Sequence, residues 1–200
     1  MRTNLTDNFF TYNMPQTSTV TAYRFLYLIT LVGIVLLGIY ACGSASTDRL
    51  FKKIDPKDSG IHFSNRISEN DTMNILTFEY INNGGGVAMA DFNNDSLVDV
   101  YFTGNHVANQ LYLNDSKTNQ LHFKDITKEA KVTGEGRWCS GVAVVDINQD
   151  NLMDIYVCTT ARKSASQRAN LLYVNQGVDA KGVPHFKEMA QEYGLADTTH

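Results

Sequence analysis

Gly86–Asp95, GVAMADFNND, is the stretch that decides the fold, because it returns about 55 residues later as Gly141–Asp150, GVAVVDINQD. Glycine, valine, alanine, aspartate and asparagine keep their places in both copies. Two more segments recur in the same order, Asn109–Asn114 as Asn170–Asn175 and His122–Ile126 as His185–Met189. Self-similarity at a period of this size indicates a protein built from stacked repeats.

Each repeat is predicted to contain four short strands. Four runs in the first repeat are rich in Val, Leu, Phe and Tyr and are separated by Asn, Asp and Gly: Val87–Ala90, Val98–Thr103, Leu111–Asn114 and His122–Ile126. Four antiparallel strands in about 60 residues match the size of one propeller blade. Helical turns are expected at Thr127–Ala130 and Ala190–Tyr193. The predicted fold class is all-β, a partial β-propeller.

The number of repeats limits what this chain can form by itself. Residues 50–200 hold about two and a half units, with repeats at 86–132 and 141–195, and Phe51–Ile54 resembles the last element of an earlier unit. A propeller closes with roughly four to eight blades, since each blade buries its faces only against its neighbours. We therefore expect an incomplete propeller, the N-terminal part of a longer protein.

Each repeat carries an acidic loop with the pattern D-x-N-x-D-x-L-x-D, at 91–99 and again at 146–154. Side-chain oxygens at positions 1, 3, 5 and 9 and the carbonyl oxygen of position 7 can surround one hard cation. Calcium accepts six to eight oxygen ligands, whereas zinc and copper prefer His and Cys, which both loops lack. The sequence predicts two Ca²⁺ sites, formed by Asp91, Asn93, Asp95, Leu97 and Asp99 and by Asp146, Asn148, Asp150, Leu152 and Asp154.

Two other interpretations of the acidic loops compete with this one. The helix–loop–helix calcium site needs Glu at position 12, where this chain has Phe102 and Val157. A solvated hairpin turn rich in Asp and Asn needs no metal. However, three carboxylates within about 5 Å repel by roughly 3 kcal/mol per pair at an effective dielectric constant of 20. Position 6 usually needs glycine and is Ser96 in the first loop and Asn151 in the second, so the first site is expected to bind more weakly.

The N-terminal segment is predicted to be a lipoprotein signal. Phe25–Ala41 is an uncharged run of 17 residues that follows Arg24 and ends at Cys42. Its end, Ile39–Cys42, resembles a bacterial lipobox, in which the cysteine is diacylated and becomes the mature N-terminus. A plain membrane anchor and a cleaved secretion signal are the alternatives.

Lipidation would attach the mature protein to a membrane, because two acyl chains hold a protein on a bilayer durably. The precursor would consist of a signal segment at 1–41, a flexible linker at 42–49 and the repeats at 50–200, with Met14 as an alternative start. We expect an exported protein that is held at the outer membrane or cell surface through lipid on Cys42.

Composition, charge and cysteine usage narrow the class of protein. A chain of 200 residues with 43% hydrophobic and 19% charged residues is an ordinary globular chain, which excludes disorder and collagen. The net charge of −4 leaves no basic field for a phosphate backbone, so no nucleic acid partner is expected.

Cys139 and Cys158 lie three residues out of register in the predicted hairpin, with Val142 opposite Cys158. Half-buried thiols are therefore expected rather than a disulfide.

Other residues of types that are common in catalytic or binding sites are expected to have structural roles here. His122 and His185 precede Phe at the same repeat position, which is typical of strand packing. Trp138 is expected to be buried between blades rather than to stack on a sugar. The run Gly84–Gly86 is expected to allow close packing near the start of a strand. No base, nucleophile and orienting residue form a catalytic pattern, so an enzyme is not favoured.

The repeat resembles the FG-GAP or VCBS unit, in which calcium is held in the hairpin loop between adjacent strands of a blade. Three segments are similar to VCBS-repeat lipoproteins related to cartilage acidic protein: Asn82–Ala88, Gly134–Trp138 and Asn170–Asn175. The resemblance covers about Leu50–Asp197 and implies further repeats and a C-terminal ASPIC/UnbV domain. Fold analogy alone does not supply a biochemical role.

Together these features predict a lipid-anchored, extracytoplasmic, calcium-binding propeller module. Its expected partners are the membrane, through Cys42, and an extracellular protein or glycan ligand, which the module would bind or scaffold. The alternative is the non-catalytic N-terminal part of a larger secreted enzyme.

Overall fold

The computed structural model describes five stretches of the chain: 17–41, 50–118, 120–134, 136–161 and 164–198, with the side chains of 17–20 and 37–41 excepted. The chain divides into two compact units, Met1–Lys52 and Lys53–His200. Cys42 and Met14, which carry the predicted lipidation and the alternative start, lie outside the described residues.

The described residues of the first unit form one helix, α1, at Thr17–Ala41. Its uncharged run from Phe25 onward holds one hydroxyl group, that of Thr30, apart from the tyrosines. The Thr30 hydroxyl donates to the carbonyl oxygens of Leu26 and Tyr27 at 3.1 and 2.9 Å, so the helix backbone satisfies it. Among the described residues, no helix combines the length and apolar character needed to cross a membrane. The signal, anchor and lipidation roles stay predictions.

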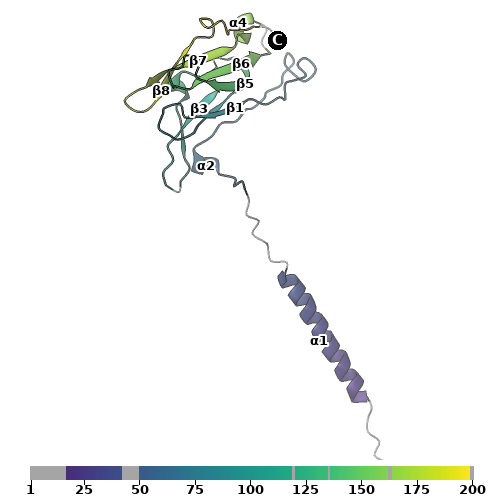
Figure 1. Cartoon of the computed structure of the whole chain (residues 1–200). Helices are drawn as coiled ribbons and strands as arrows, with labels where there is room; N and C mark the ends of the chain where they lie inside the picture. Colours follow the sequence, from purple (N-terminus) through teal and green to yellow (C-terminus); the bar gives the residue numbers. More distant parts are fainter. Residues whose placement is uncertain (1–16, 42–49, 119, 135, 162–163, 199–200) are drawn as a thin grey trace, which may run out of the picture. The chain divides into compact units, whose positions relative to one another are not determined.

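The second unit consists mostly of two four-stranded antiparallel sheets, in which strands pair in chain order (Figure 1). Each repeat forms one sheet, as an antiparallel meander joined by short loops requires. The four strands predicted in the first repeat are confirmed. The first sheet is β1 Val87–Ala90, β2 Asp99–Phe102, β3 Gln110–Asn114 and β4 Phe123–Asp125; the second is β5 Trp138–Val145, β6 Asp154–Thr160, β7 Leu171–Val178 and β8 Pro184–Glu188.

Helical structure in this unit is confined to short segments. These are α2 at Pro56–Ser59, α3 at Thr127–Ala130 and α4 at Ala165–Arg168. The expectation for α3 is confirmed, and the segment after β8 forms hydrogen-bonded turns. The strand expected at Phe51–Ile54 is wrong: this segment has no regular structure, and Phe51 is 87% exposed. A strand needs a neighbour for its backbone groups, and no described strand pairs with this segment.

The main core lies between the two sheets. Alternate residues point to this core, as the period of two in a strand requires. Tyr101 and Leu111 from the first sheet meet Val157 and Tyr173 from the second. The intervening residues form a smaller cluster on the outer face of each sheet, with Val100, Tyr112 and Phe123 on the first and Leu172, Val174 and Ala190 on the second. The two repeats therefore stack face to face, which is consistent with a β-propeller-like fold.

The two cysteines lie on neighbouring strands but form no disulfide. Cys139 in β5 pairs with Thr159 in β6, and a register shift follows before Val142 pairs with Val157. Cys158 is next to Thr159 and therefore points to the opposite face from Cys139. The predicted reduced thiols are confirmed. The predicted register is wrong: Val142 lies opposite Val157 rather than Cys158, and Cys139 is one residue rather than three out of register with Cys158. The thiols are buried (Cys139) and exposed (Cys158) rather than both half-buried.

The glycine run before β1 gives a matched test of close packing. A Cβ on Gly85 would lie 1.9 Å from the carbonyl oxygen of Thr103, whereas one on Gly84 would meet nothing within 4 Å. We expect Gly85→Ala to lower the free energy of unfolding by about 2–3 kcal/mol, because the backbone at Thr103, directly after β2, must move. Gly84→Ala is expected to change it by less than about 1 kcal/mol. Urea denaturation of both variants checks this, and equal effects would contradict it.

Candidate metal centre

Both acidic loops lie where the sequence predicts, between adjacent strands of a sheet. The loop at 91–99 joins β1 to β2, and the loop at 146–154 joins β5 to β6. The last residue of each loop, Asp99 or Asp154, is also the first residue of the second strand. The nine positions of each loop are therefore held at both ends by strand pairing.

Carboxylate-to-amide hydrogen bonds fix the shape of the first loop. Asp91 accepts from the backbone N–H groups of Asp95 and Ser96, at 3.1 and 2.8 Å. Asp95 accepts from the Leu97 N–H at 2.8 Å and from the Asn93 side-chain amide at 2.9 Å. The predicted ligand residues at positions 1, 3, 5 and 7 thus all take part in one compact turn.

The second loop repeats this arrangement bond for bond. Asp146 accepts from the N–H groups of Asp150 and Asn151 at 3.1 and 2.9 Å. Asp150 accepts from the Leu152 N–H at 2.8 Å and from the Asn148 side chain at 2.8 Å. Corresponding distances in the two loops agree within 0.1 Å. The residues that the two loops share therefore set the loop conformation, rather than the residues that differ between them.

Asp99, at position 9, is fully buried. Its carboxylate accepts from the backbone N–H of Phe92 at 2.9 Å and from that of Asn114 at 2.8 Å. The pKa of Asp99 is raised to about 6, mainly by burial and also by the nearby charges of Asp95 and Asp91, against the lowering effect of these two hydrogen bonds. The ionised carboxylate is thus disfavoured where no positive charge accompanies it.

Asp154 is the counterpart of Asp99 in the second loop and is also fully buried. It accepts from the backbone N–H groups of Ile147 and Asn175 at 2.9 and 2.8 Å. Burial again raises its pKa, and the charges of Asp150 and Asp146 add to the shift, while the amide hydrogen bonds oppose it. Both repeats therefore bury an acidic group beside two further carboxylates.

The chemistry of these side chains fits a hard cation. An ionised carboxylate has about four lone-pair sites on its two oxygens. In Asp91, Asp99, Asp146 and Asp154, each carboxylate oxygen accepts one backbone N–H hydrogen bond and so retains a second lone pair. No three Asp, Glu, His or Cys side chains of the described residues gather closely enough to hold a metal ion in this conformation. A cation would therefore have to use the retained lone pairs and draw the carboxylates together.

Position 6 adopts the left-handed backbone conformation in both loops, with φ of 69° at Ser96 and 65° at Asn151. Position 4, which the sequence argument did not single out, does so too, at Asn94 and Gln149. This conformation costs an ordinary residue about 1–2 kcal/mol, and Asn tolerates it better than Ser.

Ser96→Gly is expected to raise the free energy of unfolding by about 0.5–1 kcal/mol. The relief of the left-handed strain exceeds the additional freedom of glycine in the unfolded chain, which costs roughly 0.5–1 kcal/mol. Asn151→Gly is the matched control and should have almost no effect. Thermal denaturation of both variants checks which substitution stabilises the protein more. A larger increase in stability from Asn151→Gly than from Ser96→Gly would contradict the prediction.

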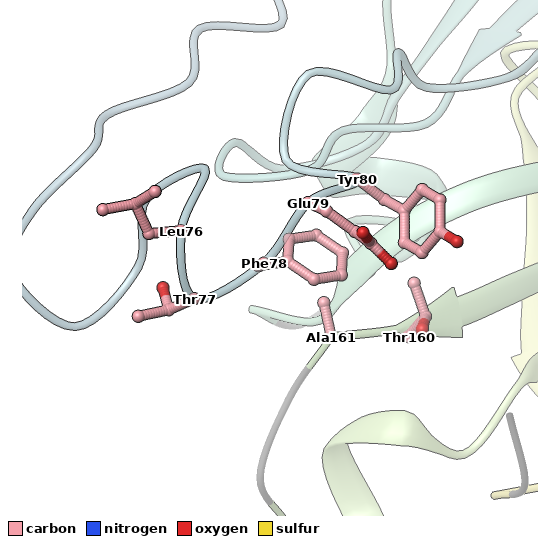
Figure 2. A pocket seen from close by; sticks show the side chains of 7 residues that line it. All are labelled: Leu76, Thr77, Phe78, Glu79, Tyr80, Thr160 and Ala161. Carbon is pink, nitrogen blue, oxygen red and sulfur yellow. The ribbon is translucent and has the colours of Figure 1, made fainter.

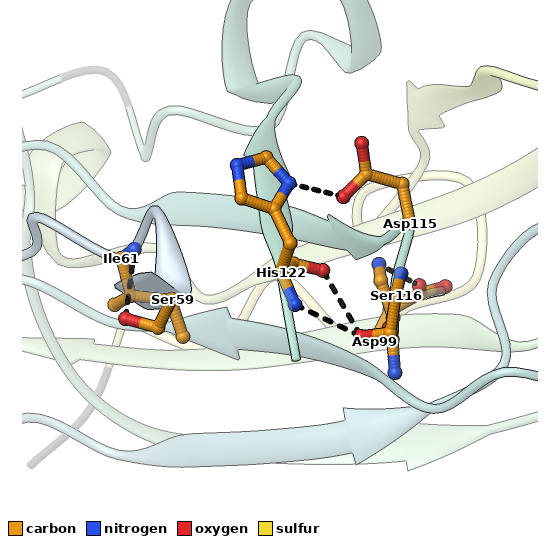
Figure 3. Close-up of polar contacts among 7 residues, drawn as sticks. Ser59, Ile61, Asp99, Asp115, Ser116 and His122 are labelled. Atoms are coloured by element: carbon orange, nitrogen blue, oxygen red, sulfur yellow. Dashed lines mark hydrogen bonds and ion pairs between the residues drawn. The ribbon is translucent and has the colours of Figure 1, made fainter. Parts of the chain in front are cut away.

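The histidines at the repeated position are partly exposed, whereas the phenylalanines that follow them, Phe123 and Phe186, are buried. The His122 and His185 side chains are 43% and 46% exposed. His122 Nδ1 contacts Asp115 (Figure 3), and His185 Nε2 lies 3.5 Å from Asp179. Ser116 contacts the backbone of His122 rather than its imidazole, so these three residues do not have the geometry of a catalytic triad.

One asparagine in the third strand of each repeat, Asn114 in β3 and Asn175 in β7, was not predicted as a functional residue. The backbone N–H groups of Asn114 and Asn175 donate to the buried aspartates Asp99 and Asp154. In addition, the Asn114 side chain donates to the Val98 carbonyl at 3.1 Å. Asn175 donates in the same way to the Met153 carbonyl at 3.3 Å, and also to the Phe92 carbonyl at 2.9 Å. The recurrence of Asn after the Leu-Tyr pair was the available signal.

The first acidic loop is also held by the second repeat. In addition to the bond from Asn175, the Asn93 side chain donates to the Gly182 carbonyl at 3.3 Å. The Asn94 side chain donates to the carbonyl of Asn151, inside the second acidic loop, at 3.4 Å. The two loops are therefore direct neighbours.

Comparison with known proteins agrees with this geometry. The pattern of the FG-GAP-like repeat matches residues 91–157, a span that begins with the first acidic loop and includes the whole of the second. A search among curated proteins found no match. The relationship to ASPIC/UnbV proteins and the lipoprotein status stay predictions. Residues 91–157 of this chain carry an FG-GAP-like repeat, which together with the two four-stranded antiparallel sheets indicates a β-propeller-like binding or scaffold module.

Proposed function

We propose that this chain is a calcium-binding, β-propeller-like module that is anchored outside the cytoplasm by lipid on Cys42 and that binds or scaffolds a protein or glycan. Each acidic loop takes one Ca²⁺ ion. The ion would be held by side-chain oxygens at positions 1, 3, 5 and 9 and by the carbonyl of Leu97 or Leu152. Calcium would supply positive charge and so order the hairpin loops that form one rim of the module.

The observation that carries the calcium proposal is the duplication of the loop with its buried aspartate. A hairpin turn that serves only to reverse the chain does not need a fully buried acid at the start of the next strand. Burial of Asp99 and Asp154 beside other carboxylates raises their pKa values, which disfavours the charged form. A divalent ion offsets this cost, and flexible oxygen coordination suits calcium better than magnesium.

Titration calorimetry of the full chain with CaCl₂ tests the proposal. We expect binding of two ions, loss of one site in Asp95→Ala, and loss of both in the double variant with Asp150→Ala. Both side chains are exposed in the structure, so their removal should change coordination more than folding. Asp115→Ala is the matched control, since Asp115 is an exposed aspartate outside the loops. Absence of heat with excess calcium, or unchanged binding in the double variant, would refute the calcium sites.

A further inference from the structure

A pocket of about 550 Å³ is lined by residues of two segments that are distant in sequence (Figure 2). Its walls come from the segment before β1 and from the end of β6. The described residues that line it are Leu76, Thr77, Phe78, Glu79, Tyr80, Thr160 and Ala161. None of these residues belongs to the predicted calcium sites.

Two aromatic rings form a corner in this pocket. Phe78 and Tyr80 have ring centroids 6.2 Å apart and an interplanar angle of 74°. Phe78 also packs edge-to-face on Trp138, at 5.3 Å and 86°, and Trp138 is buried. The inner ring is therefore fixed to the core, whereas Tyr80 is 58% exposed and available to a ligand.

Glu79 places a negative charge at the same corner. Its carboxylate lies between the Phe78 and Tyr80 rings as seen in Figure 2. Glu79 is the one charged residue among the described residues that line the pocket. Its side chain is exposed and, in the part of the chain that the structure describes, makes no hydrogen bond or ion pair. The pocket therefore combines an exposed acidic group with two aromatic rings.

We propose that this pocket binds a lysine or arginine side chain of a protein partner. The faces of aromatic rings attract organic cations, and a carboxylate within the same site adds a direct ion pair. Leu76, which is 93% exposed, offers an apolar surface to the alkyl stem of such a side chain. A sugar ring would stack on one flat aromatic face, whereas two rings at 74° with a carboxylate beside them match an organic cation. This inference rests on the proposed binding role and names the chemistry of the partner.

The pocket and the calcium sites can be tested separately. Thr160 is the last residue of β6 and Asp154 is the first. A strand rises about 3.3 Å per residue, which places the two sites roughly 20 Å apart along β6. Cation binding in the pocket should therefore persist in the Asp95→Ala and Asp150→Ala double variant, even if calcium binding is lost or was never present.

NMR titration of the full chain with two blocked tripeptides tests the pocket. The probes are acetyl-Gly-Arg-Gly-amide and its neutral citrulline analogue, which has the same shape without the charge. We expect both to shift the amide signals of residues 76–80 and 160–161, with the arginine peptide binding about tenfold more tightly. Glu79→Gln should abolish that difference, and Tyr80→Leu should weaken the arginine peptide by about fivefold.

Glu192→Gln is the matched control, because Glu192 is an exposed glutamate that pairs with Lys187 elsewhere on the surface. It should leave both affinities unchanged. Equal binding of the two peptides, tighter binding of acetyl-Gly-Glu-Gly-amide, or tighter binding of maltotriose at the same signals would overturn the proposal. Retention of the arginine preference in Glu79→Gln would overturn it as well.

Discussion

Asp99→Ala is expected to lower the free energy of unfolding by about 2–4 kcal/mol. The substitution removes the acceptor of two backbone N–H groups, those of Phe92 and Asn114. Each donor left unsatisfied in a buried site costs about 1–3 kcal/mol. Part of the loss is offset at neutral pH, because burial raises the pKa of Asp99 and its removal also relieves the cost of a buried charge.

Urea denaturation of the full chain at pH 7, with and without calcium, measures this effect. Asp115→Ala is the matched control: its exposed contact with His122 should contribute less than about 1 kcal/mol. If calcium binds as proposed, the loss in Asp99→Ala should be larger in its presence, because the variant cannot gain from the ion. A loss no larger than that of the control would show that the buried carboxylate does not hold the hairpin.

Trp138→Ala is expected to lower the free energy of unfolding by about 3–5 kcal/mol, the range for a large aromatic residue removed from a core. Trp138 is 1% exposed and packs edge-to-face on Phe78 and on His106, at 5.3 and 4.8 Å between ring centroids. It therefore joins the first strand of the second sheet to two loops that precede it in the chain. The prediction that Trp138 is buried is confirmed by its position.

Thermal and urea denaturation followed by far-UV circular dichroism checks this variant, since Trp138 is the single tryptophan and its fluorescence is lost. Trp138→Phe keeps an aromatic ring and should recover more than half of the lost free energy. Leu76→Ala, at a side chain that is 93% exposed, should have little effect. A small loss in Trp138→Ala would mean that the loops hold together without the ring.

Much of the fold was predictable because the information is local. Short β-branched and aromatic runs between Asn, Asp and Gly predicted the strands of the first repeat, and repetition predicted the second sheet. The glycine run before β1 was also interpreted correctly, since Gly85 and Gly86 leave no room for a side chain. The acidic loops lie between strands as expected because chain reversal and strand pairing depend on neighbouring residues.

The rest depends on contacts between residues that are distant in sequence. The bonds from Asn114 to Asp99, and the bonds from the second repeat to the first loop, require a register that the sequence does not display. His122 lies just before the short β4, and its side chain contacts Asp115 rather than the core. The pocket likewise joins Phe78 to Thr160, about eighty residues later in the chain.

The contacts between the first acidic loop and the second repeat join the two repeats at the loops themselves. Asn175, Gly182 and Asn151 of the second repeat all bond to residues 92–94 of the first loop. Because Asn151 lies in the second acidic loop, the bond from Asn94 ties each loop to the other. Loss of order in one loop should therefore loosen its neighbour, so that in a longer array a local defect would spread between adjacent units.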